Sequence, residues 1–290
     1  MKKIIFTGLS LFFLGNLFAQ IKEGKIVYER TVQPQMRISG NGPGGMPPGM
    51  NEEMMARFQR PRTNKFELSF ANNQTLWQQV EEPNQQNQNF GGGDRSGGGD
   101  RGGMQMRVVM AGGATEEIVY TNIREGTSIS KKALGVDDFL VSDSIKKMSW
   151  KLSGETQEVS GYNCRKATAQ KIGTRMEVKM VNGKMARSEV ADTSIYVAWF
   201  TTDIPVSAGP DLQGQLPGAI LELNINNGRT VYKAVSVSDQ IKVTDVKEPK
   251  GGKKVTAAVF AKKRDQFIEE TSSNMQGQGQ GGNRTIIMNH

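Results

Sequence analysis

The side chains that most often perform catalysis are scarce in this chain. It contains one cysteine, Cys164, and one histidine, His290, which is the last residue. A cysteine nucleophile usually needs a histidine base, and Ser-His-Asp triads and histidine-based zinc sites also require a histidine within the fold. Because His290 ends a polar tail, we interpret Cys164 as a core thiol, and we predict no catalytic residue, no metal site and no cofactor. A single cysteine also excludes an internal disulfide framework.

Aromatic and carboxylate side chains gather around a segment rich in proline and glycine at 201–218, which lies between two apolar runs at 195–200 and 219–225. Loops that join rigid strands often bind ligands. We therefore predict a binding surface at this segment, formed by two aromatic residues and two carboxylates: Trp199, Phe200, Asp203 and Asp211. A structural interpretation stays open, in which the prolines and glycines only fix the path of the chain across the sheet.

The same segment closes with a turn signature, Leu216-Pro217-Gly218. Proline presets its own backbone φ and pushes the preceding residue into an extended conformation. A type II turn needs a positive φ at its third residue, which glycine adopts without steric cost. We predict a structural turn of this type, with Gly218 at positive φ.

Methionines offer a second chemistry near the low-complexity parts of the chain. Thioethers are ligands for Cu(I), although methionine is also an adaptable apolar contact. Copper binding is therefore an alternative function, because methionines flank these segments at irregular spacing: Met36, Met46, Met50, Met54, Met55, Met104 and Met106.

The elements that must position these residues are mainly strands. The runs at 195–200 and 219–225 are apolar at odd and even positions, which is typical of strands buried on both faces in the middle of a sheet. Helical periodicity appears only at 256–270. Asn182-Gly183 and Asn226-Asn227-Gly228 predict hairpin turns. Further strands are predicted at 25–32, 64–70, 75–80, 107–110, 117–122, 138–143, 148–152, 164–170, 176–180, 229–237 and 240–246.

The first residues predict export. Lys2 and Lys3 precede an apolar run at 4–18, which indicates a signal peptide over 1–19. We expect a periplasmic or extracellular protein, with no transmembrane segment in the mature chain because no other apolar run approaches the length of a span. The formal net charge of +8 does not indicate a nucleic-acid partner in that setting. It suits acidic glycans or lipopolysaccharide better.

The mature chain is predicted to be one mainly β domain with an antiparallel sheet. Two inserts rich in glycine and other small or polar residues cannot bury apolar surface, so we expect them to be flexible. The predicted boundaries are 20–271 for the domain, 33–62 and 83–103 for the inserts, and 272–290 for a disordered tail.

Once these elements are placed, the stretch LPGAILEL at 216–223 resembles the GLPGLI family of exported Bacteroidetes proteins. Further matches are GKIVYER, DDFLVSD, SWKLSGETQEVSGYNCRKATA and PKGGKKVT, in the expected order. The chain departs from the pattern at Gln215, where the family name has its first glycine, and at Ala219, where it has leucine.

The resemblance implies a fold more clearly than an activity. A similar module forms the bowl-like N-terminal part of a bacterial glycan-removing amidase, so the resemblance implies a curved sheet, either a bowl or a half-barrel. A fold alone does not give a function. We predict a non-enzymatic binding or accessory protein of the cell envelope, whose partner is an envelope protein, a glycan or a lipid-like ligand. The alternative is an enzyme or enzyme subunit that acts on glycans or peptides through carboxylates.

Overall fold

The computed structural model describes residues 21–33, 60–80, 115–181 and 184–277. Several sequence predictions lie outside these ranges: the signal peptide, the methionines named above, the 83–103 insert, the strand at 107–110 and the Asn182-Gly183 turn. Most of the 33–62 insert also lies outside them, although Arg62 is the first residue of strand β2.

The described strands form one 12-stranded sheet in the order β12-β6-β5-β4-β3-β2-β1-β11-β10-β9-β8-β7. Neighbouring strands are antiparallel, except that β12 runs parallel to β6. The strands are β1 (Gly24–Val32), β2 (Arg62–Ala71), β3 (Gln74–Val80), β4 (Thr115–Asn122), β5 (Thr127–Leu134), β6 (Asp137–Ser144), β7 (Trp150–Val159), β8 (Tyr162–Val181), β9 (Lys184–Thr201), β10 (Ala219–Ile225), β11 (Thr230–Ser238) and β12 (Lys253–Thr256).

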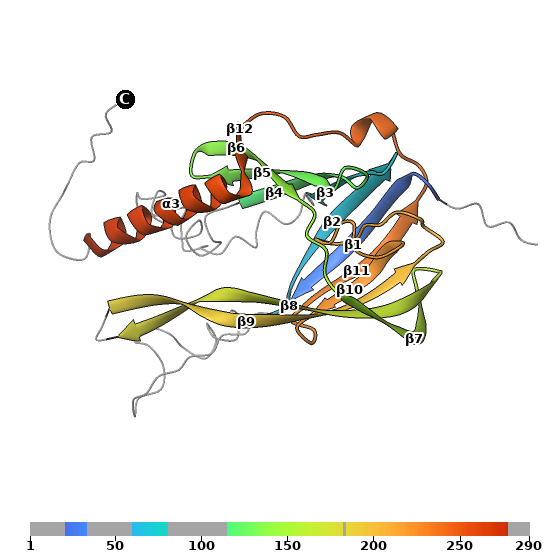
Figure 1. The fold of residues 1–290 in the computed structure, drawn as a ribbon, viewed down its shortest axis with the longest axis horizontal. Helices are drawn as coiled ribbons and strands as arrows, with labels where there is room; N and C mark the ends of the chain where they lie inside the picture. Colours follow the sequence, from blue (N-terminus) through green and yellow to red (C-terminus); the bar gives the residue numbers. More distant parts are fainter. Residues whose placement is uncertain (1–20, 34–59, 81–114, 182–183, 278–290) are drawn as a thin grey trace, which may run out of the picture.

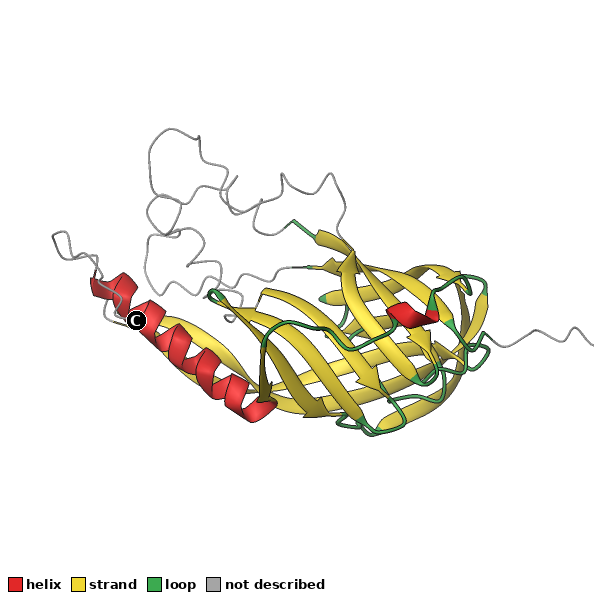
Figure 2. Ribbon diagram, turned by 90° about the horizontal axis from the view of Figure 1, so that it is seen from above, coloured by secondary structure: helices red, strands yellow, loops and turns green. Residues whose placement is uncertain are grey.

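The sheet is strongly curved, so that the strands of its two ends lie opposite one another, with β2, β1, β11 and β10 between them (Figures 1 and 2). The long β8–β9 ribbon runs opposite the layer that contains β4, β5 and β6. This architecture confirms the predicted class, a mainly β chain with a curved antiparallel sheet and a helix near the C-terminus.

The face of the sheet that carries Ile26, Tyr28 and Leu68 is called the inner face here, because these side chains are fully buried in the main core. Residue alternation along β1 places Arg30 on that face as well. The apolar runs at 195–200 and 219–225 lie in β9 and β10, which have sheet neighbours on both sides, as predicted. The expected burial on both faces is wrong for β9, because Ile195 is 38% exposed.

Helix α3 (Ala257–Gly277) covers the far end of the inner face. The residues that pair with Leu68 in the successive strands β3, β4 and β5 lead to Val141 on β6, so Val141 also lies on the inner face. Val141 and Phe139 are buried against Phe260 of the helix, with the two phenylalanine ring centroids 5.5 Å apart. The predicted helix at 256–270 is therefore confirmed, but it continues to Gly277, so the first part of the predicted tail at 272–290 is helical.

Two local predictions differ from the structure. Residues 240–246 were expected to form a strand, but Val243–Asp245 form a 3-10 helix after the last residue of β11. Strand β5 was not predicted, because most of its residues are half-buried and give no clear apolar alternation. The Asn226-Asn227-Gly228 hairpin is confirmed, since all three residues have positive φ and Ile225 pairs with Thr230.

None of the helices in the described ranges combines the length and the apolar character that a membrane span requires.

Candidate functional site

The segment 201–218 fills the interior of the curved sheet instead of forming an exposed loop. Ile204, Val206 and Ala208 are buried in the main core cluster, at alternate positions of the chain. Backbone hydrogen bonds fasten the segment to β10, from Ala219 N–H to Ile204 C=O at 3.1 Å and from Ile220 N–H to Ala208 C=O at 2.8 Å. The structural interpretation of these apolar residues is thus correct, because they supply core packing.

The turn at Leu216-Pro217-Gly218 is not the predicted type II turn. Gly218 does not have a positive φ, whereas Gly214 does, at 69°. Glycine is needed at 218 for a different reason, which is the close approach of another backbone segment. A Cβ atom on Gly218 would lie 2.0 Å from the carbonyl oxygen of Thr201. Leu216 is buried in the core and Pro217 is exposed.

The structure separates the four predicted binding residues. Phe200 is a core side chain with 1% exposure. Trp199, its neighbour on β9, points to the opposite face, where the Lys166 ammonium lies 5.8 Å from its ring centroid. Asp203 and Asp211 are both exposed, and Asp211 accepts a hydrogen bond from the inner-face residue Tyr232. These side chains therefore do not form one binding surface.

Asp211 belongs to a polar cluster on the inner face that joins β1, β9, β11 and the 201–218 segment. The hydroxyl of Tyr232 donates a short hydrogen bond to Asp211 Oδ2. Tyr232 pairs with Arg30 of β1 in the register of the sheet. Burial, together with the nearby Asp211 carboxylate, raises the pKa of Tyr232, and Arg30 opposes that shift. The pKa of Tyr196 is raised by burial and, to a smaller extent, by the same carboxylate.

We call Arg30, Tyr196, Asp211 and Tyr232 the inner-face polar cluster. Sequence reasoning selected only Asp211 of the four. The sequence could also have indicated Arg30, because the alternation in KIVYERTV places it on the same strand face as the buried Ile26 and Tyr28.

Arg30 is the end of a stack of planar groups. Its guanidinium carbon lies 4.6 Å from the ring centroid of Phe66. Phe66 in turn stacks on Trp77, with centroids 5.0 Å apart and an interplanar angle of 5°. Tyr28 and Tyr232 pack against Trp77 at 5.6 and 6.0 Å. Since the aromatic rings are buried, they position Arg30 but do not present a ring surface to a ligand.

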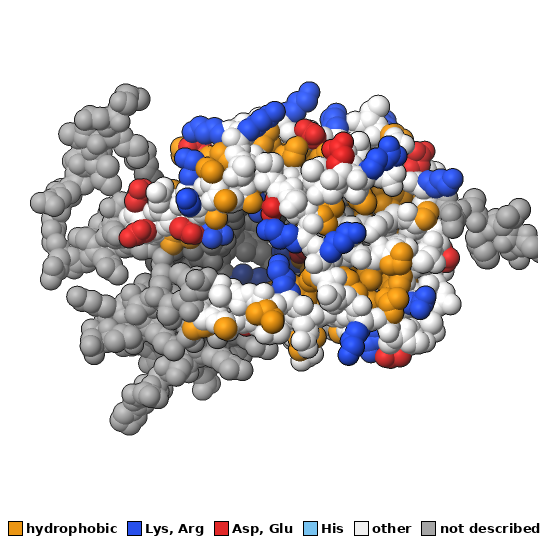
Figure 3. Space-filling model, in the orientation of Figure 1, with side chains coloured by type: hydrophobic (Ala, Val, Ile, Leu, Met, Phe, Trp, Pro, Cys, Tyr) orange, Lys and Arg blue, Asp and Glu red, His pale blue; other side chains and the backbone are white. Residues whose placement is uncertain are grey.

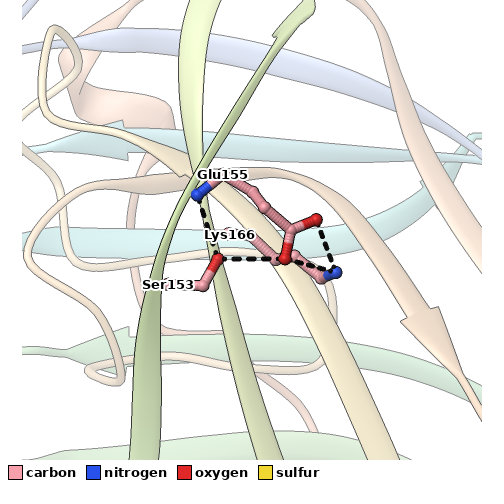
Figure 4. A network of polar contacts seen from close by, with 3 residues as sticks. All are labelled: Ser153, Glu155 and Lys166. Atoms are coloured by element: carbon pink, nitrogen blue, oxygen red, sulfur yellow. Dashed lines mark hydrogen bonds and ion pairs between the residues drawn. The ribbon is translucent and has the colours of Figure 1, made fainter.

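Several carboxylates elsewhere in the described ranges are paired with lysines. Glu155 Oε2 lies 2.9 Å from Lys166 Nζ, and Ser153 donates a hydrogen bond to Glu155 (Figure 4). The Lys166 hydrogen bond lowers the pKa of Glu155. Asp137 and Asp138 bind two different lysines, at 2.9 and 3.1 Å, as expected for neighbours that point to opposite faces.

Cys164 is fully buried, as predicted. Burial raises the pKa of its thiol to about 12, and the thiol donates to the Tyr162 carbonyl oxygen at 3.6 Å. A thiol with such a pKa is protonated at neutral pH and does not act as a nucleophile.

No group of three or more His, Cys, Asp and Glu side chains that could hold a metal ion occurs in the described part of the chain. The methionines proposed as copper ligands lie outside that part, so the copper alternative is not tested by the structure.

The surface is hollowed between the layer of β4, β5, β6 and α3 on one side and the β8–β9 ribbon on the other (Figure 3). Lysine and arginine side chains lie at the rim of this hollow. Lys132 of β5 shares the inner face, and its ammonium lies 6.0 Å from the ring centroid of Phe260 on α3. The inner face is therefore basic where it opens, and apolar where the 201–218 segment fills it.

Comparisons with known proteins give a family description without an activity. Residues 150–222 match a family model described as a protein of unknown function (Porph_ging). No curated protein matches this chain. The GLPGLI name does not appear in the match, so that resemblance stays a prediction.

Two solved structures are similar in fold over much of the chain. They are PNGF-II in space groups P21 and C2, each with 16% identity and a TM-score of 0.46 over 86% of this chain. The chain spans about a third of those proteins, 34% and 33% of their lengths. The family match thus gives a domain of unknown function over residues 150–222.

Proposed function

We propose that this protein is an exported binding protein of the cell envelope, periplasmic or extracellular, which receives its ligand in the hollow over the inner-face polar cluster. The observation that carries the proposal is the placement of a few convergent polar side chains in a concave and otherwise apolar face. Ligand sites in proteins have this composition, with apolar walls and a small number of polar groups that fix orientation. Export is supported by the signal-peptide pattern at 1–19.

The distribution of carboxylates favours binding over hydrolysis. Glycoside hydrolysis by two carboxylates, and acid–base catalysis in general, require acidic groups that converge on one substrate. In the described ranges, Asp137, Asp138 and Glu155 lie against lysines, and Asp211 accepts the hydrogen bond of Tyr232. Asp203 and Glu222 both lie near Cys164, but the thiol between them is buried in the core. The segment 201–218 has a supporting role in this proposal, since it holds Asp211 in place while its apolar residues fill the core.

Native mass spectrometry tests the proposal. The purified mature protein is incubated with detergent-free envelope extract, which contains glycan fragments, peptides and lipids, and is then re-purified and weighed intact. We expect a defined mass adduct on the wild-type protein. The adduct should be lost in the double variant Arg30→Met/Tyr196→Phe, which removes one guanidinium and one hydroxyl group of the inner-face polar cluster.

The matched control is Asp203→Ala, which removes an exposed carboxylate outside the cluster. It should keep the adduct. Loss of the adduct in Asp203→Ala together with retention in the double variant would place the binding surface on the exposed edge of the 201–218 segment and refute the hollow. Absence of an adduct on the wild-type protein, or conversion of extract glycopeptides to new masses, would refute the binding function itself.

A further inference from the structure

Arg30 is an arginine without a counter-ion. Within the described part of the chain, no ion pair joins its guanidinium to a carboxylate, and Asn64 Oδ1 accepts a hydrogen bond from Nη2 at 3.3 Å. Its Nε–H is buried and has no acceptor in the structure. Buried polar groups almost always have a partner, so a donor of this kind requires an explanation.

The neighbouring carboxylate does not supply the missing acceptor. Asp211 is engaged by the hydroxyl of Tyr232, which lies between it and Arg30. Tyr232 therefore interacts with both Asp211 and Arg30.

The guanidinium is also held in place before any ligand arrives. It lies over Phe66, which is stacked on Trp77, and it is tied to Asn64. Fixing a binding group in advance removes part of the entropy cost of binding. A planar guanidinium presents paired N–H groups that match the two oxygens of a carboxylate or phosphate, and a lysine cannot reproduce that geometry.

We propose that Arg30 binds an oxyanion, a carboxylate or a phosphate group carried by the ligand that enters the hollow. This inference rests on the proposed function and specifies its ligand class. The basic rim of the hollow attracts an anionic ligand toward the site by its field. Arg30 then supplies the directional contact.

The test is a titration followed by nuclear magnetic resonance on the full mature protein, at constant ionic strength. The probes are sodium glucuronate, glucose 6-phosphate and neutral glucose, and the signal is the Arg30 Nε–H resonance together with the backbone amides around it. At least one anionic probe should give saturable shifts, and glucose should give none. Glucuronate alone would assign a carboxylate ligand, glucose 6-phosphate alone a phosphate ligand, and equal binding of both an oxyanion of either kind.

Variants make the assignment specific. Arg30→Lys keeps the charge but not the paired donors, so its Kd for the anionic probe should rise tenfold or more. Arg165→Lys, an exposed arginine of β8, should leave the Kd unchanged. The backbone amide spectrum of each variant shows whether it is folded, and a well-folded Arg30→Lys with an unchanged Kd would overturn the proposal.

The two proposals fail separately. If the envelope adduct forms and survives Arg30→Lys, and no anionic probe shifts Arg30, the oxyanion assignment is wrong while the binding function stands. If the wild-type protein shifts with an anionic probe but carries no envelope adduct, the arginine site is real and the envelope function is wrong.

Discussion

Gly218→Ala should destabilise the protein strongly, and for a steric reason. The added Cβ would lie 2.0 Å from the Thr201 carbonyl oxygen and 2.7 Å from its carbonyl carbon. Real Cβ atoms stay at least 3.0 Å from such atoms, so one of the two backbone segments must move by about 3.0 − 2.0 = 1.0 Å. Both are fixed, because Thr201 is buried at the end of β9 and pairs with Ala219 of β10.

This backbone movement sets how much Gly218→Ala lowers the free energy of unfolding. Overpacking a rigid core usually costs 1–3 kcal/mol, and disrupting a strand pair adds about 1 kcal/mol for each lost hydrogen bond. We expect about 3 kcal/mol or more in the free energy of unfolding. For a protein of this size, that corresponds to a fall of about 6–12 °C in Tm.

Variants at two other glycines distinguish the steric cost of an added Cβ atom from the cost of backbone strain. Gly126 has φ of 70° and open space around its Cβ position, so Gly126→Ala should cost only the strain of the left-handed conformation, about 1–2 kcal/mol. Gly154 has neither a positive φ nor a neighbour within 4 Å, so Gly154→Ala should be neutral or slightly stabilising. Urea unfolding of the three variants, with the m-value checked for constancy, measures these differences. A cost for Gly218→Ala no larger than that for Gly126→Ala would refute the close approach.

Three further predictions use the same unfolding assay. Asp211→Ala leaves the buried Tyr232 hydroxyl without its acceptor and should lower the free energy of unfolding by about 1–3 kcal/mol. Asp203→Ala should change it by no more than about 0.5 kcal/mol. Equal effects of the two variants would contradict the pairing of Asp211 with Tyr232. Gln215→Gly removes four side-chain hydrogen bonds and should cost about 1–3 kcal/mol; three of them tie the 201–218 segment to the β6–β7 connection and the start of β7, and an unchanged urea midpoint would contradict the prediction. The thiol of Cys164 has an ordinary pKa of 9.0 that burial raises to about 12, so the folded state holds its proton more tightly. Stability should therefore be level below pH 9.0 and fall between pH 9.0 and about pH 12, and Cys164→Ala should make that decline shallower than in the wild-type protein.

Local sequence pattern determined the secondary structure of most of the described chain. Alternation in β1 and β2, the two-sided apolar runs of β9 and β10 and the Asn226-Asn227-Gly228 turn all depend on neighbours within a few residues, which a pattern contains. The burial of Cys164 was also predictable, because a thiol without a histidine base is usually a core residue. Strand β5 was missed since its half-buried residues leave no such pattern.

Contacts between distant segments were decided only by the tertiary structure. The sequence placed 201–218 between two strands, but only the folded, curved sheet shows that its apolar residues fill the interior and that Gly218 lies against the Thr201 backbone. In the same way, Arg30 and Tyr232 come together because β11 pairs with β1, a strand far away in the chain. Strand pairing is set by the sum of many weak long-range contacts, so the inner-face polar cluster could not be assembled from local sequence pattern.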